Sequence, residues 1–332
     1  MPGTFTRALL RGDCIIAFGK KTSLVCVVVI AVITAVALGL QFNSARESYD
    51  RFVDEALFEN GVKINLIGTS KFSRDDSDKT IKFGINPSAT SQSKDYVRDI
   101  YSFLGSIDGR SVSVTEQATD IFDGTRYVYI GTTADASAQK NGAEFVGILK
   151  KSSGKVFPNS RSEEFWSYLL TSLPAFNGTP LFFNSEFARI DFNSVIKNSA
   201  PHKLENTRIE KSVVFVNVPD SQNFSNYVAL QEIFQEYNLA SDINDPEFKL
   251  KSILYDHDDQ LGSLTGTQRR DELQKNASMG LCPFDVMLTK QLRQSGGNNP
   301  RPAGSLEFAF LLFTAHYYHW KSQLNIFDDR CW

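Results

Sequence analysis

The chain has 332 residues, of which 42% are hydrophobic and 22% are charged, and its formal net charge is −3. These proportions are ordinary for a globular protein, so they exclude a largely disordered chain and predict a packed core. A net charge near zero, without a long run of lysine and arginine, argues against a nucleic-acid partner.

The first predicted element is a membrane anchor. Ser23–Leu40 is an uncharged run of eighteen residues, which as a helix would span roughly 27 Å, close to the thickness of a bilayer core. Basic residues dominate before the run, whereas acidic and basic residues are mixed after it. This asymmetry predicts that residues 1–22 are cytoplasmic and that the main domain is extracytoplasmic. We therefore expect residues 23–41 to be a single-pass anchor in the inner (cell) membrane. A cleaved signal peptide, with a shorter apolar region, is the alternative.

The next residues are expected to form a helical stalk, residues 42–60, followed by one domain over residues 61–294. Within the domain, alternation of apolar and polar residues predicts strands, and apolar spacing of three and four residues predicts helices. The predicted strands are Val62–Ile67, Thr80–Ile85, Ser111–Thr115, Arg126–Ile130 and Val213–Val218, with a helix at Asp95–Leu104.

Residues 134–212 do not fit this order of strands and helices. The pair Ser160 and Glu163 has the spacing of a capping box and predicts a helix, which Pro174 and Gly178 would end. We expect the whole span to be an insertion that packs as a lobe on the side of the sheet.

A helix is predicted within Asn226–Asp242. Its apolar residues fall mostly at three- and four-residue spacing, which is typical of an amphipathic helix. Ser225 precedes it as a candidate N-cap. Asn238 is the candidate for a left-handed turn at the end of the helix.

The last elements are two helices joined by a linker. Phe284–Leu292 is predicted to be helical, and Ser295–Gly304 is rich in glycine, proline and asparagine, which is typical of a linker. Ser305–Leu324 is strongly apolar and aromatic but has too short an uncharged run to span a membrane. We expect residues 295–332 to be a linker and an aromatic helix that packs against the domain or against a partner.

Only two cysteines follow the predicted anchor. Cys282 and Cys331 form an even pair in a compartment that the anchor predicts to be oxidising, so they are candidates for a disulfide. Two buried free thiols are the alternative.

The segment that follows Asn226 resembles the long zinc motif of metzincin peptidases, His-Glu-x-x-His-x-x-Gly-x-x-His-Asp. Gln231, Gln235 and Ser241 stand where the three histidines would be. Glu232 stands at the position of the general base, and Asp242 stands at the trailing aspartate. The resemblance therefore keeps the spacing of the motif and loses all three metal ligands.

Two later segments extend the resemblance. Lys251–Tyr255 is similar to the turn that lies beneath the metal, with Leu254 in place of methionine and Tyr255 following without a spacer. Met279–Val286 resembles the start of the last catalytic-domain helix. With Lys71–Phe72, these segments resemble a bacterial family of extracytoplasmic domains of unknown function, number twenty-nine twenty-seven. The resemblance implies an α+β fold: a zincin-like twisted mixed sheet with a backing helix and a site helix.

The residue types at the motif positions argue against zinc chemistry. A zinc peptidase needs three protein ligands and an open position for water. Amide and hydroxyl oxygens are weak zinc donors, so we expect no metal and no cofactor, and Glu232 would have no polarised water to act on. The sequence predicts a pseudoenzyme that binds at the membrane, with an envelope protein or a cell-wall component as partner and no nucleic acid.

The alternative is a divergent metallopeptidase or hydrolase that uses Glu232 with His257. A serine hydrolase is not supported, because no Gly-x-Ser-x-Gly sequence is present. His316 and His319 have helical spacing but stand among aromatic residues, so we expect them to pack rather than to bind a metal.

Overall fold

The structure is a computed structural model. The residues it describes are 41–59, 62–63, 72–74, 79–115, 126–131, 138–156, 167, 169–171, 178–183, 207–209, 211–217, 222–255, 268, 271–272, 275, 277–294 and 301–332. The predicted anchor lies outside these residues. Among the helices that are described, none has both the length and the apolar character needed to cross a bilayer.

The chain divides into two compact units, residues 1–49 and 50–332. In the first unit, residues 41–49 are helical. The second unit contains the sheet and also the C-terminal residues 301–332. The aromatic C-terminal helix is therefore part of the same unit as the sheet.

The second unit is built on a mixed sheet of five strands. The strands are β4 (Thr80–Ile85), β5 (Ser111–Thr115), β6 (Arg126–Ile130), β7 (Gly178–Phe183) and β9 (Lys211–Val216), in the order β5-β4-β6-β9-β7. All neighbouring strands are parallel except β7, which runs antiparallel to β9 at one edge. The mixed sheet that the sequence predicts is present.

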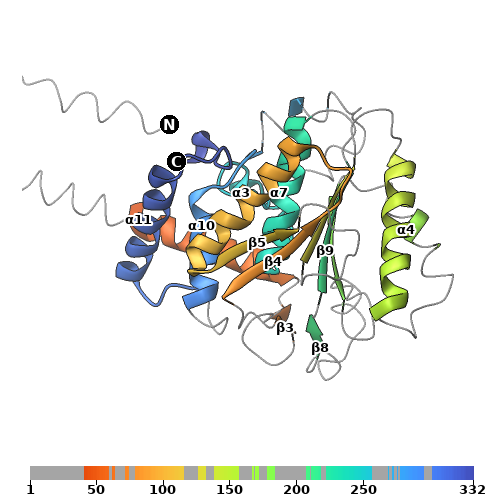
Figure 1. The fold of residues 1–332 in the computed structure, drawn as a ribbon. Helices are drawn as coiled ribbons and strands as arrows, with labels where there is room; N and C mark the ends of the chain where they lie inside the picture. Colours follow the sequence, from red (N-terminus) through yellow and green to blue (C-terminus); the bar gives the residue numbers. More distant parts are fainter. Residues whose placement is uncertain are drawn as a thin grey trace, which may run out of the picture. The chain divides into compact units, whose positions relative to one another are not determined.

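Helices cover both faces of this sheet, so the fold is α/β and not the α+β class that the resemblance implies (Figure 1). On one face lie α3 (Ser91–Asp108) and α7 (Gln222–Asn238), and on the other lies α4 (Ala138–Val156). Strands β6 and β9 are therefore covered on both sides. Their sequences, RYVYI and KSVVFV, are rich in the β-branched and aromatic residues that suit a strand in this position.

Local signals define α3, the helix between the two parallel strands β4 and β5. Thr90 caps its start and accepts a hydrogen bond from the Ser93 backbone N–H (3.1 Å). Gly109 ends it in a left-handed conformation with φ of 71°. The helix is fixed to the sheet by Tyr101, whose ring stacks on Phe83 of β4 at 4.4 Å between centroids.

The span 134–212 is not a separate lobe in its described parts. Helix α4 packs directly on the sheet, where Phe145 contacts Tyr129 and Phe215 at 5.2 and 4.9 Å between ring centroids. Strand β7, from the same span, is the edge strand of the sheet. The span therefore completes the main fold, because its apolar residues are buried against β6 and β9.

The remaining described elements are short strands and helices. Two strand pairs lie outside the main sheet: β1 (Phe58–Glu59) with β2 (Val62–Lys63), and β3 (Phe72–Arg74) with β8 (Thr207–Ile209). Residues 50–57 are also helical. The 3-10 helices are η3 (Pro246–Phe248) and η4 (Asp329–Cys331).

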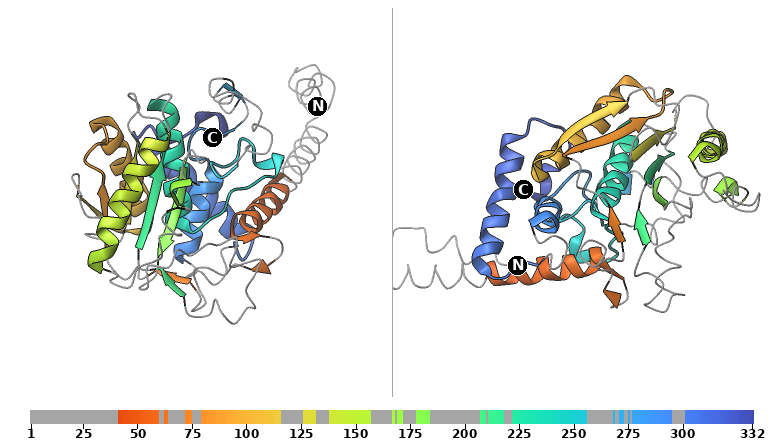
Figure 2. Two further views of the ribbon diagram at one scale, coloured as in Figure 1. Left: turned by 90° about the vertical axis from the view of Figure 1, so that its right-hand side faces the viewer. Right: turned by 60° about the horizontal axis from the view of Figure 1, so that its bottom comes forward.

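Two helices follow α7 in the chain and pack together. They are α10 (Pro283–Gln294) and α11 (Ser305–Lys321), and the right view in Figure 2 agrees with Figure 1 in placing α11 on the outer side of α10. The aromatic helix therefore packs against the domain through one of its faces.

Candidate binding site at the end of helix α7

Helix α7 is enclosed by the rest of its unit. It begins at Gln222, so Ser225 lies inside its first turn and is buried, and the prediction of Ser225 as the N-cap is wrong. Residues 227–239 are all buried, so the helix is not amphipathic in the expected sense. Its polar side chains face other elements, and each of them needs a partner.

The helix ends with a left-handed residue, one position later than predicted. Leu239 has φ of 53°, whereas Asn238 is the last helical residue. The Asn238 side-chain amide donates to the Phe234 carbonyl oxygen (3.2 Å), and the Ala240 N–H donates to the Gln235 carbonyl oxygen (3.1 Å). This is the bond of a Schellman turn. Leu239 is buried, and its burial offsets the cost of about 1–2 kcal/mol for a left-handed non-glycine residue.

The turn brings Asp242 back to the helix, where it meets both glutamines of the motif. The side-chain nitrogen of Gln231 donates to Asp242 Oδ1 at 3.2 Å, and that of Gln235 donates to the same oxygen. Both glutamines are buried, whereas Asp242 is exposed. Three of the residues that the sequence singles out therefore form one amide–carboxylate cluster.

The predicted turn at residues 252–255 is joined to the same loop. The Ile243 N–H donates to the Leu254 carbonyl oxygen (2.8 Å), and Ile243 forms a parallel bridge with Tyr255. Leu254 and Tyr255 are both buried. Ser241, in contrast, is held by its backbone: its N–H donates to the Ala56 carbonyl oxygen (2.9 Å). No hydrogen bond in the described part of the chain joins its side chain to Gln231 or Gln235.

A buried carboxylate that sequence reasoning did not select fixes this turn. Asp285, in the first turn of α10, accepts from Ser252 Oγ (2.5 Å) and from the backbone N–H groups of Ile253 (3.0 Å) and Cys282 (2.8 Å). Burial raises the pKa of Asp285 to about 7, although these three hydrogen bonds act in the opposite direction. Asp285 therefore connects the turn to the start of α10.

The side chain of Glu232 projects from α7 toward the edge strand β7. A Cβ atom on Gly178 of β7 would come within 2.6 Å of Glu232 Cγ and of Val228 Cγ1, so the helix and the strand can approach this closely only at glycine. Glu232 is itself buried. It belongs to the contact between α7 and β7, while Gln231 and Gln235 face Asp242.

A second buried carboxylate on α7, Glu236, joins the helix to three other elements. It accepts from Tyr101 of α3 (3.1 Å) and from Ser212 of β9 (2.5 Å), and it pairs with Arg126 of β6 (3.3 Å). Arg126 and Glu236 are both buried. Sequence reasoning missed this network, although the placement of Arg126 in phase with Val128 and Ile130 indicated that it faces inward.

The residue after Glu236 lies between two guanidinium groups. The Tyr237 ring lies 5.4 Å from the Arg126 guanidinium carbon and 5.1 Å from that of Arg293 of α10. Its hydroxyl donates to Asp108, which also pairs with Arg293 (3.0 Å). Burial, and then the Asp108 charge, raise the pKa of Tyr237 above its ordinary value. These contacts hold the last turn of α7 rigidly.

Of the four histidines, the structure describes His316 and His319, both on α11. His257 and His202 lie outside the described residues. His316 contacts Trp332 edge-on at 5.5 Å between ring centroids, and His319 stacks on the same ring at 4.2 Å and bonds Asp329 (3.2 Å). Across the ranges that the structure describes, no three His, Cys, Asp or Glu side chains are grouped so that they could hold a metal ion.

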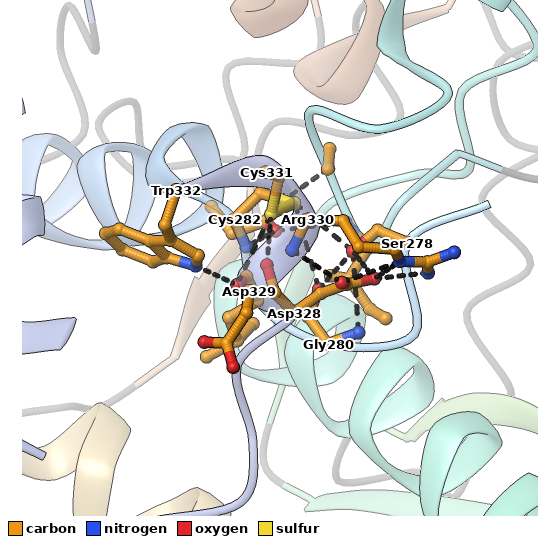
Figure 3. Close-up of a disulfide and its surroundings, with 12 residues drawn as sticks. Ser278, Gly280, Cys282, Asp328, Asp329, Arg330, Cys331 and Trp332 are labelled. Atoms are coloured by element: carbon orange, nitrogen blue, oxygen red, sulfur yellow. Dashed lines mark hydrogen bonds and ion pairs between the residues drawn. A yellow bond between two sulfur atoms is a disulfide. The ribbon is translucent and has the colours of Figure 1, made fainter.

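The predicted cysteine pair forms a disulfide, shown in Figure 3. Cys282 and Cys331 have their Cα atoms 5.6 Å apart. Next to the bond, the Trp332 indole N–H donates to the Leu281 carbonyl oxygen (2.9 Å). Gly280 allows the tail to approach, since a Cβ there would lie 2.5 Å from the Phe327 backbone. The C-terminal residues are therefore fastened to the segment that leads into α10.

No known protein assists the assignment: no family model, no curated protein and no solved structure matches this chain. The resemblance to the bacterial family of extracytoplasmic domains therefore stays a prediction.

Proposed function

We propose that this protein is a membrane-anchored, extracytoplasmic binding module with a zincin-like frame and no zinc centre. The cluster of Gln231, Gln235 and Asp242 at the end of α7 is its ligand-contacting site. An envelope protein or a cell-wall component is its partner. The location rests on the apolar segment Ser23–Leu40, and the disulfide suits an oxidising compartment.

The arrangement of elements supports the zincin-like frame. A twisted mixed sheet carries the backing helix α3, the last parallel strand β9 leads into the site helix α7, and a turn at residues 252–255 is bonded to the loop after that helix. These are the parts that the resemblance implies, in the same chain order.

One observation carries the proposal: two side-chain amides bind one carboxylate at the positions where the motif would hold an ion. Gln231 and Gln235 are four residues apart, so they project from the same face of α7. A neutral amide is a poor zinc ligand but a good hydrogen-bond donor. The donors are directed at Asp242, which suits a fixed polar surface better than a metal site.

The chemistry of the cluster indicates which ligand groups would suit it. Asp242 is exposed and carries negative charge, and the glutamines hold it in place. A carboxylate is an acceptor only, so it favours ligands that donate, such as an amino group or the N–H groups of a peptide. We expect a polar, donor-rich ligand rather than an anionic one.

Grafting of metal ligands tests the frame directly. In the purified full-length chain, the double variant Gln231→His and Gln235→His places two imidazoles on one helical face beside Asp242, which completes three ligands. We expect the variant to bind one equivalent of zinc and the parent chain to bind none, as measured by elemental analysis and by calorimetric titration.

The matched control is Ser102→His with Ser106→His on the exposed side of α3. The control also carries Asp99→Asn, because Asp99 lies three residues before Ser102 on the same face of α3. The control then has the same four-residue spacing without a neighbouring carboxylate on its helix. We expect zinc to bind at least ~10-fold more weakly there, because one of the three ligands of a zinc site is missing. Equal affinities at the two sites would refute the frame. Stoichiometric zinc in the parent chain, lost on Glu232→Ala or His257→Ala, would favour the divergent hydrolase instead.

A further inference from the structure

Helix α11 exposes a narrow line of large apolar side chains. Leu306, Phe310, Phe313, Tyr317 and Trp320 are 89%, 60%, 70%, 43% and 81% exposed. They follow one another at spacings of four, three, four and three residues along the whole helix. We call these five residues the α11 seam.

The opposite side of the helix is already used for packing. Phe308, Leu311 and Ala315 are buried, and α11 packs there against α10. At 100° per residue these three residues lie on the side of the helix away from the seam. The seam is therefore a second apolar face, which is additional to the one that the fold needs.

The apolar area of the seam lies at or above the upper end of the range that monomers usually expose. At about 150–250 Å² for each side chain of this size, the exposed fractions correspond to on the order of 500–850 Å². The largest apolar patch of a typical monomer is about 300–600 Å². A standard protein–protein interface buries about 800 Å² on each partner. The exposed area of one seam is therefore close to the area that one partner contributes to such an interface.

The shape of the seam favours a helix as its partner. Its five residues fall within about 80° of the helix circumference, which is the narrow width of a coiled-coil stripe. A helix that lies in a lipid surface has a broader apolar face bordered by many lysines and arginines. In α11 the only lysine or arginine is Lys321. The observations therefore favour protein over lipid.

We propose that the α11 seam binds the α11 seam of a second copy of this chain, with the two helices antiparallel. Phe313 is the middle residue of the seam: Leu306 and Trp320 lie seven residues before and after it, and Phe310 and Tyr317 lie three and four residues away. The seam is therefore approximately complementary to itself under a two-fold axis at Phe313. Glu307, whose carboxylate accepts from Gln291 Nε2 (3.2 Å), lies near one end of the helix, and Lys321 lies at the other. Antiparallel pairing brings these opposite charges together at both ends.

Disulfide trapping tests the pairing in the full-length chain in its own membrane. The background carries Cys14→Ser and Cys26→Ser, so that only introduced thiols can react. Phe313→Cys lies at the proposed axis, where two copies come within disulfide distance. We expect mild oxidation to convert most of this variant to a covalent dimer. Leu312→Cys, the next residue on the same helix but directed about 100° away, is the matched control and should stay monomeric.

A second cross-linking experiment tests whether the two α11 helices are antiparallel. Leu306→Cys or Trp320→Cys alone should give little dimer, whereas cells that express both variants should give the mixed dimer, because antiparallel helices place these two ends together. Dimers from either variant alone, without enrichment of the mixed dimer, would overturn the antiparallel arrangement.

Disruption of the seam provides a measurement that does not depend on cysteine. Phe310→Glu with Phe313→Glu should raise the dissociation constant of the purified dimer at least ~100-fold in sedimentation equilibrium, with an unchanged circular dichroism spectrum. A parent chain that is monomeric at tens of micromolar and gives no cross-link at Phe313→Cys overturns the proposal. The zinc-binding test on α7 would remain valid after that result, because its substitutions lie on a different helix from the seam.

Discussion

At the scale of single residues, Asp285 shows how a buried carboxyl group can organise a loop. It receives two backbone N–H groups and the Ser252 hydroxyl, and it lies fully inside the protein. Burial raises its pKa to about 7, so near neutral pH the group is divided between its two protonation states. When Asp285 is protonated, Oδ1 can carry the proton and donate it to Ser252 Oγ. Its Oδ2 then still accepts from both backbone N–H groups.

This raised pKa predicts a dependence of stability on pH. The folded-state pKa lies above the ordinary value of 3.8, so the contribution of Asp285 is fully present below about pH 4 and is lost as the pH rises through 7. The total loss is on the order of 4 kcal/mol, since one unit corresponds to about 1.4 kcal/mol, and about 3 kcal/mol of it falls between pH 5 and pH 8. Urea unfolding of the parent chain and of Asp285→Asn at pH 5 and pH 8 measures it.

Asparagine mimics the neutral carboxyl group, so Asp285→Asn should be more stable than the parent by about 1–2 kcal/mol at pH 5 and by about 4 kcal/mol at pH 8. Asp285→Ala leaves the two N–H groups without an acceptor and should cost about 2–4 kcal/mol at both pH values. A large loss on Asp285→Asn already at pH 5 would mean that the group is ionised there.

At the scale of elements, the fold depends on polar contacts between buried surfaces as well as on apolar packing. The pair of Arg126 and Glu236 joins β6 to α7, and both side chains are about 1% exposed or less. Charges in such a position stabilise only as a matched set, because each of them has lost its hydration. The register of α7 on the sheet is therefore fixed by charge as well as by shape.

A comparison of two ion pairs tests this. Glu236→Gln leaves a buried guanidinium without its counter-charge and should lower the free energy of unfolding by about 3–5 kcal/mol. Asp95→Asn, which breaks the exposed pair with Arg98 on α3 (2.8 Å), should change it by less than about 0.5 kcal/mol. Thermal unfolding of the two variants measures both effects. Similar losses would contradict the role given to burial.

The same contrast explains what the sequence could predict. Strands β4, β5 and β6 have the predicted bounds, because alternation is a local signal. The edge strand β7 was not predicted as a strand: Gly178 and Pro180 indicate a break, and proline is tolerated there because an edge strand leaves one side unpaired. The motif spacing placed Gln231, Gln235 and Asp242 together. The partners of Asp285 and Glu236 come from distant elements, so no local pattern could identify them.

At the scale of the whole molecule, the C-terminal tail closes the unit that carries the sheet. The disulfide joins positions 49 residues apart and so bounds a loop that contains α10 and α11. Asp328 adds hydrogen bonds to the Met279 N–H (2.8 Å) and to Arg330. The disulfide and these hydrogen bonds therefore link the final residues to the start of α10. Helix α11, which carries the seam, lies within the loop that the disulfide closes.

Removal of the bond should be costly. Chain-entropy arguments give about 4 kcal/mol for a loop of this size, so Cys282→Ser with Cys331→Ser should lower the unfolding free energy by about 2–4 kcal/mol. Reduction of the parent chain should have the same effect, and limited proteolysis of either form should cut first after residue 321. If residues 322–332 stayed as protected as in the oxidised chain, the remaining hydrogen bonds would be sufficient to hold the tail.

The left-handed residue at the end of α7 sets a strict length for the segment that follows. From Leu239 the backbone has only two further residues before Asp242 must reach the paired glutamines. Insertion or deletion of a single residue here would carry the carboxylate out of reach and leave the buried amides without this acceptor. Variation in this protein should therefore occur as substitutions in residues 239–241, never as a change in their number.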